Sequence, residues 1–274
     1  MESQSPLAIT RCGDMELRWG ERTYVMGILN LTPDSFSGDG LGDDVEAAVA
    51  RAKHLVDEGA DIIDIGGEST RPGAPPVSAD EELRRVMPVI ERLSAELSVP
   101  ISIDTYKSAV ASRAVRAGAR MINDVWGLKR DPKLARVAAE AGVPIVLASY
   151  LQDTVRRDII SEVISDLEKS MEQATGAGVA EPNIIIDPGI GFGKSAEQNL
   201  EIIHRLSELR VLGRPILLGT SRKFMVGQPF DQRLEATAAT VAIGIAHGAD
   251  MVRVHEVEPM VQVCRMSDAI IRRR

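Results

Sequence analysis

Eight apolar runs in this sequence each end in polar or charged residues that could bind one small ligand together. In chain order these residues are Asn30, Asp64 with Glu68 to Arg71, Asp104, Asn123 with Asp124, Ser149, Asp187, Thr220 to Lys223, and Arg253 with His255. A lone aspartate after a strand is often a turn residue, but eight such positions favour one shared ring. Because one carboxylate accepts two parallel N–H bonds, Asp104 and Asp187 are candidates for binding the guanidine-like edge of a polar heterocycle.

A repeated unit must position these residues. Six times, a charged helical pattern ends in glycine and an apolar, β-branched run follows, at Gly59, Gly118, Gly142, Gly178, Gly213 and Gly248. Glycine adopts the left-handed conformation that ends many helices without a steric cost. With the further runs 23–31 and 100–104, the pattern predicts eight buried strands. Helical patterns lie near 44–58, 79–97, 107–117, 131–141, 158–177, 195–210, 231–247 and from 259 to the C-terminus.

This alternation of strand and helix predicts an α/β fold, a single (β/α)8 TIM barrel over residues 23–274. Runs such as IIDI and IIID are apolar on both faces, as parallel strands covered by helices require. Residues 1–22 are expected to form a short N-terminal β-hairpin, turning at Gly13 and Asp14, that plugs the amino-terminal end of the barrel. A doubly wound open sheet is the alternative, because periodicity does not demonstrate closure.

In a barrel of this kind, ligands bind at the carboxyl ends of the strands. Arg253 and His255 of the eighth strand then lie beside Asn30 of the first. Arginine offers a planar fork of donors and histidine a further donor, so this group predicts a site for a phosphate-sized anion. Alternatively, Arg253 pairs with a nearby carboxylate such as Glu256.

Three segments that follow predicted strands have sequences typical of binding loops or tight turns. Residues 31–42 and 66–76 are long and rich in glycine and proline, which predicts binding loops or lids. Phe36, within the first, either covers a ligand or packs on the barrel rim. The segment GIGFGKS at 189–195 is not a P-loop, because three residues instead of four separate Gly189 from Gly193. We interpret it as a tight turn that directs Phe192 toward the ligand of Asp187.

Composition narrows the class of protein further. The 274 residues are 44% hydrophobic with a net charge of −8, which excludes a disordered chain and disfavours a nucleic-acid partner. No apolar run approaches the ~18 residues of a membrane span, so no membrane partner is expected. Cys12 and Cys264 stand far apart, and the N-terminus lacks the pattern of a secretory signal. We therefore expect a cytoplasmic location.

Seven ordered motifs resemble those of one family, the dihydropteroate synthases. They are MGILNLTPDSFSGDG (26–40), DIIDIGGESTRPGA (61–74), SIDT (102–105), IND (122–124), IDPGIGFGK (186–194), SRK (221–223) and RVHEV (253–257). The resemblance covers the chain from Tyr24 onward. It implies a pterin-binding transferase of folate biosynthesis that joins 6-hydroxymethyl-7,8-dihydropterin pyrophosphate to p-aminobenzoate and releases pyrophosphate. It also implies a Mg²⁺ cofactor, a homodimer and a target of sulfonamides.

The resemblance also assigns residues to parts of the ligand. On the pterin side it places Asp104, Asn123, Asp187, Phe192 and Lys223. On the pyrophosphate side it places Asn30, Arg253 and His255, with Asn30 also near Mg²⁺. Around p-aminobenzoate it places Thr70, Arg71, Pro72 and Phe36. Asp104, Lys223 and Asn30 are the expected catalytic residues, because departure of pyrophosphate leaves positive charge on the pterin methylene while cations and Mg²⁺ stabilise the leaving group.

The sequence departs from the family pattern at two places, which leaves two alternative functions open. After the fifth strand the family usually has Met-His-Met, whereas this chain has Ala148-Ser149-Tyr150, and Phe224 follows Lys223 where many members have serine. One alternative is a pterin-binding paralogue without synthase activity. Another is a pterin-dependent methyltransferase acting with a corrinoid partner, which the intact segments 32–36 and 221–223 disfavour.

Overall fold

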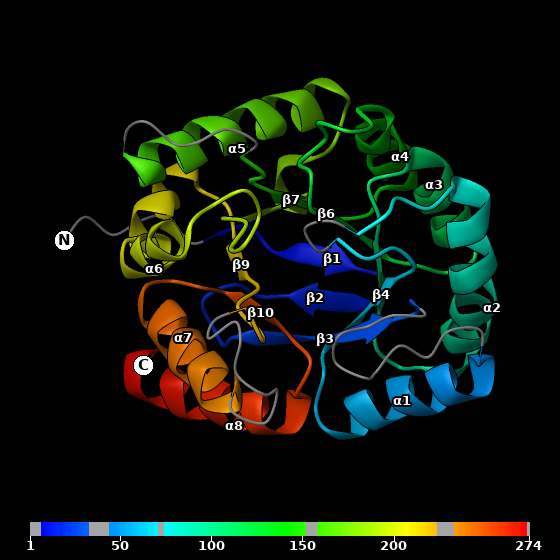
Figure 1. Ribbon diagram of the computed structural model, residues 1–274, viewed down its shortest axis with the longest axis horizontal. Helices are drawn as coiled ribbons and strands as arrows, with labels where there is room; N and C mark the ends of the chain where they lie inside the picture. Colours follow the sequence, from blue (N-terminus) through cyan, green and yellow to red (C-terminus); the bar gives the residue numbers. More distant parts are fainter. Residues whose placement is uncertain (1–6, 33–43, 71–73, 152–157, 224–232, 273–274) are drawn as a thin grey trace.

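The large sheet consists of eight parallel strands that curve into a barrel (Figure 1). A computed structural model describes residues 7–32, 44–70, 74–151, 158–223 and 233–272. The strands pair in the order β8-β7-β6-β5-β4-β3-β10-β9. A parallel bridge between Ile186 in β8 and Ile216, just before β9, joins the two edges. The predicted TIM barrel is therefore confirmed, and the doubly wound open sheet is excluded. The strand bounds are β3 (Tyr24–Asn30), β4 (Ile62–Gly66), β5 (Ile101–Asp104), β6 (Met121–Asp124), β7 (Ile145–Ala148), β8 (Ile184–Asp187), β9 (Leu217–Leu218) and β10 (Met251–Val254).

Helices surround the barrel and follow the strands in turn (Figure 1). The six glycines expected to end helical segments all have positive φ. The pattern at 195–210 is not one helix, because it divides at Arg205 into α6 and a 3-10 turn, η2. The last helix begins at Val257 and not at Pro259, since a proline is tolerated in a first turn whose N–H groups lack helical partners. The bounds are α1 (Val45–Asp57), α2 (Ala79–Glu96), α3 (Ser108–Arg116), α4 (Lys133–Ala141), α5 (Ile159–Gly176), η1 (Glu181–Asn183), α6 (Ala196–His204), η2 (Leu206–Leu212), α7 (Leu234–Ala246) and α8 (Val257–Ile271).

Side chains that point into the barrel change from apolar to polar along several of the strands. Because side chains alternate between the two faces of a strand, residues two apart lie on the same face. Apolar side chains of the interior form one buried cluster, made by Met26, Ile62, Met121, Val146, Ile185, Leu217 and Met251. Two residues further along, the same faces carry Asp64, Asn123, Asp187 and Arg253. The barrel therefore has an apolar floor beneath a polar rim.

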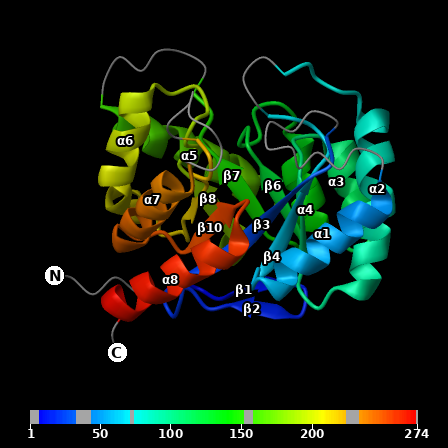
Figure 2. The ribbon, with the colours of Figure 1, turned by 60° about the horizontal axis from the view of Figure 1, so that its bottom comes forward.

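The predicted hairpin is present and seals the floor. Strands β1 (Thr10–Cys12) and β2 (Met15–Leu17) pair antiparallel, and Cys12, Leu17 and Trp19 join the buried cluster of the barrel interior. Trp19 Nε1 donates to Thr10 Oγ1 at 2.9 Å, which satisfies the buried indole. The hairpin lies across the end of the barrel opposite the polar rim (Figure 2). As for membrane insertion, none of the helices in the described ranges combines the length and apolar character that a span requires.

Candidate functional site

The polar rim brings together the inward-facing residues at the carboxyl ends of the strands. Strand register places Asn30 opposite Gly66, Gly66 opposite Asp104, and Asp104 opposite Asn123, so these positions share one layer of the barrel. Asp104 and Asn123 are buried, and Asn30 is partly exposed. Asn30, Asp104 and Asn123 therefore lie at one end of the barrel, where the sequence predicted them.

Arg253 lies inside this ring and pairs with two carboxylates. Its Nε donates to Asp64 Oδ2 and its Nη2 donates to Asp104 Oδ2, both at 2.6 Å. Asn123 Nδ2 donates to the same oxygen of Asp64 at 2.9 Å. The alternative in which Arg253 pairs with a carboxylate is therefore confirmed, but Glu256 is the wrong partner. Glu256 instead accepts from Arg222 Nε at 2.6 Å.

Asp64 is the residue of this network that the sequence placed at a strand end without assigning it a role in binding or catalysis. It is fully buried in the middle of β4 and joins Asn123 to Arg253. Its signal was the run IIDIG, in which an aspartate interrupts a buried strand that is otherwise apolar. A buried carboxylate needs partners, and in a barrel they come from neighbouring strands.

Two acceptor atoms in the ring have no donor within the described part of the chain. These are Oδ1 of Asp64 and Oδ1 of Asp104, both buried. Buried polar atoms in native proteins almost always have hydrogen-bond partners, and these two oxygens can accept hydrogen bonds from the N–H groups of a ligand.

Burial alters the proton affinity of the ring residues. It raises the pKa of Asp104 to about 7, although the guanidinium of Arg253 acts in the opposite direction. Burial also raises the pKa of Asp187 and lowers that of Lys223 to about 8, and each of these two groups opposes the shift of the other. Such shifts of acid and base toward each other are common in active sites.

Asp187, Phe192 and Lys223 meet on the other side of the ring. Asp187 Oδ1 accepts from Gly189 N at 2.6 Å. Lys223 Nζ donates to the carbonyl of Ile190 at 2.7 Å and lies 4.5 Å from the centre of the Phe192 ring. The tight turn predicted at 189–195 therefore carries Phe192 to the site, as expected.

His255 lies next to the ring and contacts the segment after β9. Its Nδ1 is 2.9 Å from Ser221 Oγ, which also accepts from the backbone N–H of His255. Arg253, in β10, and His255, just after it, therefore have different neighbours although they are close in the sequence. Their joint role in binding pyrophosphate with Asn30 stays a prediction.

The start of the segment after β4 is held by charged groups. Lys107 Nζ pairs with Glu68 and Glu82, and Arg85 Nη1 donates to the carbonyl of Gly67 at 2.9 Å. Thr70, partly buried, follows this anchored start. Of the other expected p-aminobenzoate residues, Phe36, Arg71 and Pro72 lie outside the described residues, as does Phe224.

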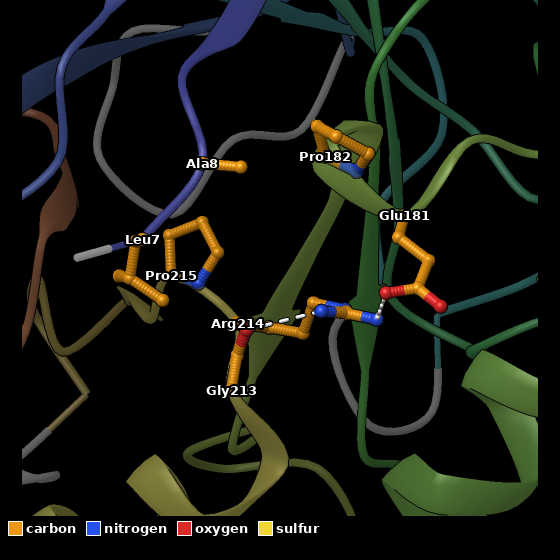
Figure 3. A pocket seen from close by; sticks show the side chains of 7 residues that line it. All are labelled: Leu7, Ala8, Glu181, Pro182, Gly213, Arg214 and Pro215. Carbon is orange, nitrogen blue, oxygen red and sulfur yellow. Dashed lines mark hydrogen bonds and ion pairs between the residues drawn. The ribbon is translucent and has the colours of Figure 1, made fainter. Parts of the chain in front are cut away.

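A cavity of about 190 Å³ lies elsewhere, near the start of the hairpin (Figure 3). In it, Arg214 Nη2 donates to Glu181 Oε2 at 2.8 Å. Several of the residues that line it come just before β8 and β9 in the sequence. The cavity therefore lies at the amino-terminal end of the barrel and is separate from the ring. It is lined by Leu7, Ala8, Glu181, Pro182, Gly213, Arg214 and Pro215.

A family model described as "Pterin binding enzyme" matches residues 26–255. The chain belongs to this family. Among curated relatives, it is 52% identical to the dihydropteroate synthase of Bacillus subtilis, over 93% of this chain and 91% of the relative. It is 49% identical to the dihydropteroate synthase of Clostridium beijerinckii, over 96% of this chain and all of the relative.

Solved structures of family members have the same fold. The dihydropteroate synthase of Clostridium difficile, determined in the presence of pteroic acid, aligns with a TM-score of 0.89 and 49% identity, covering 93% of this chain and 99% of that one. The dihydropteroate synthase of Burkholderia cenocepacia, complexed with 7,8-dihydropteroate, aligns with a TM-score of 0.86 and 37% identity over 97% and 98% of the two chains.

Proposed function

We propose that this chain is a dihydropteroate synthase, a transferase that condenses 6-hydroxymethyl-7,8-dihydropterin pyrophosphate with p-aminobenzoate. The observation that carries the proposal is a pair of buried carboxylate oxygens without donors in the described residues, Oδ1 of Asp64 and Oδ1 of Asp104. They lie in a barrel about half identical to curated synthases along nearly its whole length. Carboxylate oxygens of this kind accept the amine and ring N–H groups of a pterin. Family members determined in the presence of pteroic acid or complexed with 7,8-dihydropteroate support the same class of ligand.

In this reaction the bond from the pterin methylene carbon to pyrophosphate breaks, and the amine nitrogen of p-aminobenzoate bonds to that carbon and loses a proton. Positive charge grows on the methylene, and the carboxylate of Asp104 stabilises it in a site that excludes water. Arg253 holds Asp104 in place through a charge-assisted hydrogen bond of 2.6 Å. The amine of p-aminobenzoate is itself the nucleophile, so the scheme requires no covalent enzyme intermediate.

The donor set fits Mg²⁺ only as an ion that arrives with the diphosphate. No group of three His, Cys, Asp or Glu side chains in the described ranges could hold a metal by itself. Mg²⁺ is commonly held by one or two protein oxygens together with substrate phosphates and water. The amide oxygen of Asn30, at the end of β3, would supply such a protein oxygen. The bound ion would stabilise negative charge on the departing pyrophosphate.

The proposal is tested by turnover with the purified protein. With both substrates and Mg²⁺, we expect equal amounts of pyrophosphate and 7,8-dihydropteroate, measured by a phosphate-coupled assay and by chromatography. An Asp104→Asn variant should lose about a hundredfold or more in kcat, because electrostatic groups of this kind contribute on that order. Pterin binding without any product would instead select the paralogue that lacks synthase activity.

We further propose that the protein acts as a homodimer. Apolar side chains on three helices that pack side by side (Figure 1) support this: Leu200 on α6, Ile243 on α7, and Met266 and Ile270 on α8 are between 47% and 65% exposed. Neighbouring exposed apolar residues mark surfaces that associate.

A cytoplasmic location is part of the proposal, supported by the two buried free thiols of Cys12 and Cys264.

A further inference from the structure

Lys194 is a partly buried cation that contacts none of the ring carboxylates by hydrogen bond. It ends the loop between β8 and α6, and its side chain folds back against that loop. Its Nζ donates to the carbonyl oxygens of Ser149 at 2.6 Å, Gly189 at 3.1 Å and Phe192 at 3.2 Å. An ammonium group has three N–H donors, so these three acceptors use all of them. Lys194 therefore links the loop after β8, residues 188–194, to the segment after β7.

The two segments are in direct backbone contact at this point. A Cβ atom added to Gly189 would lie 1.9 Å from the carbonyl oxygen of Ser149, and one added to Gly193 would lie 1.4 Å from that of Leu151. Both glycines have positive φ, which disfavours other residues. The loop has no room to approach more closely, and the hydrogen bonds of Lys194 oppose its separation.

Tyr150 makes a second link between the same segments. Its ring stacks on Trp126 with centroids 3.8 Å apart and planes 16° apart. It also faces the ring of Phe192, with centroids 5.6 Å apart. Such aromatic pairs stabilise a contact beyond the effect of the apolar area they bury.

The loop in turn fixes the cation and the carboxylate on the pterin side of the ring. Lys223 Nζ is held by the carbonyl of Ile190 and by the face of Phe192. The N–H of Gly189 donates to Asp187. A shift of the loop would therefore move Lys223 and Asp187 together.

We propose that Lys194 is a positioning residue, which holds this loop so that Lys223, Phe192 and Asp187 are arranged for the pterin before it binds. The inference rests on the proposed function, since it takes the ligand of Asp187 and Lys223 to be a pterin. Lys194 acts through the loop and does not itself touch the substrate. Binding is tighter when the receiving groups are already ordered, because less conformational entropy is lost on association.

The test compares the Lys194→Met variant with wild type by calorimetry, using 6-hydroxymethyl-7,8-dihydropterin pyrophosphate and Mg²⁺ without p-aminobenzoate. Methionine has similar length and no N–H donor. Burial lowers the pKa of Lys194 to about 7, with Asp187 and Asp166 opposing the shift and Lys223 and Lys129 adding to it. The titration is therefore done at pH 6.5, where the ammonium form predominates. We expect the Kd of the variant to rise about tenfold or more.

Lys129→Met is the matched control. Lys129 follows β6 and pairs with Asp166 at 2.9 Å. Like Lys194, it donates from Nζ to a backbone carbonyl, that of Trp126 at 3.3 Å. It has no described hydrogen bond to the loop 188–194, and its variant should bind the pterin as wild type does. In turnover assays, KM for p-aminobenzoate should change less than about twofold in Lys194→Met, which separates a positioning role from general loss of structure.

The outcomes are distinct. Failure of wild type to bind the pterin contradicts the proposed function. Wild-type binding together with an equal Kd for a folded Lys194→Met variant overturns the inference alone. If the methionine variant does not fold, two other tests take its place. One is Lys194→Gln, which keeps two N–H donors, and the other compares Tyr150→Leu with Tyr150→Phe. Weaker pterin binding in Lys194→Gln and in Tyr150→Leu but not in Tyr150→Phe supports the inference, and wild-type Kd values in all three overturn it.

Discussion

Asp104 and Lys223 lie at the carboxyl ends of the barrel strands, and burial moves their pKa values toward each other, to about 7 and about 8. Removing a charge from water disfavours the ionised form of both groups. Arg253 limits this effect at Asp104, because its guanidinium favours the carboxylate. The charge state of the site is therefore set by a few buried neighbours and is sensitive to pH near neutrality.

This balance predicts the pH dependence of kcat/KM. The folded-state pKa of Asp104 is raised, so its carboxylate forms only as pH rises through about 7, and activity should rise with it. Activity should fall at higher pH as Lys194, with a pKa of about 7, and Lys223, with a pKa of about 8, lose their protons. In Arg253→Met the rising limb should move to higher pH, because the cation that lowers the pKa of Asp104 is gone. Arg136→Met, on the exposed side of α4, is the control. Steady-state rates between pH 5.5 and 9 check this, and an unmoved limb would show that another group controls it.

Among the structural elements, the loop after β8 is the one whose backbone shape determines the site. Gly189 and Gly142 both have positive φ, near 70° and 66°, so alanine costs each about 1 kcal/mol in backbone conformation. They differ in surroundings, because a Cβ at Gly142 meets nothing within 4 Å whereas one at Gly189 meets the carbonyl of Ser149 at 1.9 Å.

Alanine substitutions at Gly142 and Gly189 should therefore differ in their effect on pterin binding. Gly142→Ala, at the end of α4, should lower stability slightly and leave the pterin Kd unchanged. Gly189→Ala should weaken pterin binding about tenfold, because the loop that carries Phe192 must move away from Ser149. Thermal unfolding and calorimetry on both variants measure the two effects. Equal Kd values for the two variants would mean that the position of the loop does not matter for binding.

The elements could be predicted from sequence because their signals are local. Glycine at helix ends and apolar runs on both strand faces mark the eight strands without knowledge of the whole fold. Closure could not be predicted, because it depends on the bridge between Ile186 and Ile216. The same applies to Arg253: Glu256 is close in sequence, but Asp64 and Asp104 lie 189 and 149 positions away and are brought to it by the barrel. The proximity of Lys194 to Ser149 was hidden for the same reason.

At the scale of the whole molecule, the two ends of the barrel have opposite characters. The hairpin closes one end with Cys12, Leu17 and Trp19, and the charged ring occupies the other. Helices α6, α7 and α8 lie on the outside of the barrel (Figure 2), and each carries exposed apolar residues. Assembly and ligand binding are therefore separable.

This separation predicts the effect of a charge on the α8 surface. The wild-type protein should sediment at about twice its chain mass of 29.6 kDa, and Met266→Glu should shift it toward the monomer, since a glutamate buried in an apolar interface without a partner is strongly unfavourable. Gln173→Glu, on exposed α5 across the barrel (Figure 1), adds the same charge and should leave the dimer intact. The pterin Kd of the Met266→Glu monomer should stay near that of wild type, because Asp64, Asp104 and Lys223 belong to one barrel. A monomeric wild type in sedimentation at micromolar concentration would contradict the proposed dimer without affecting the proposed reaction.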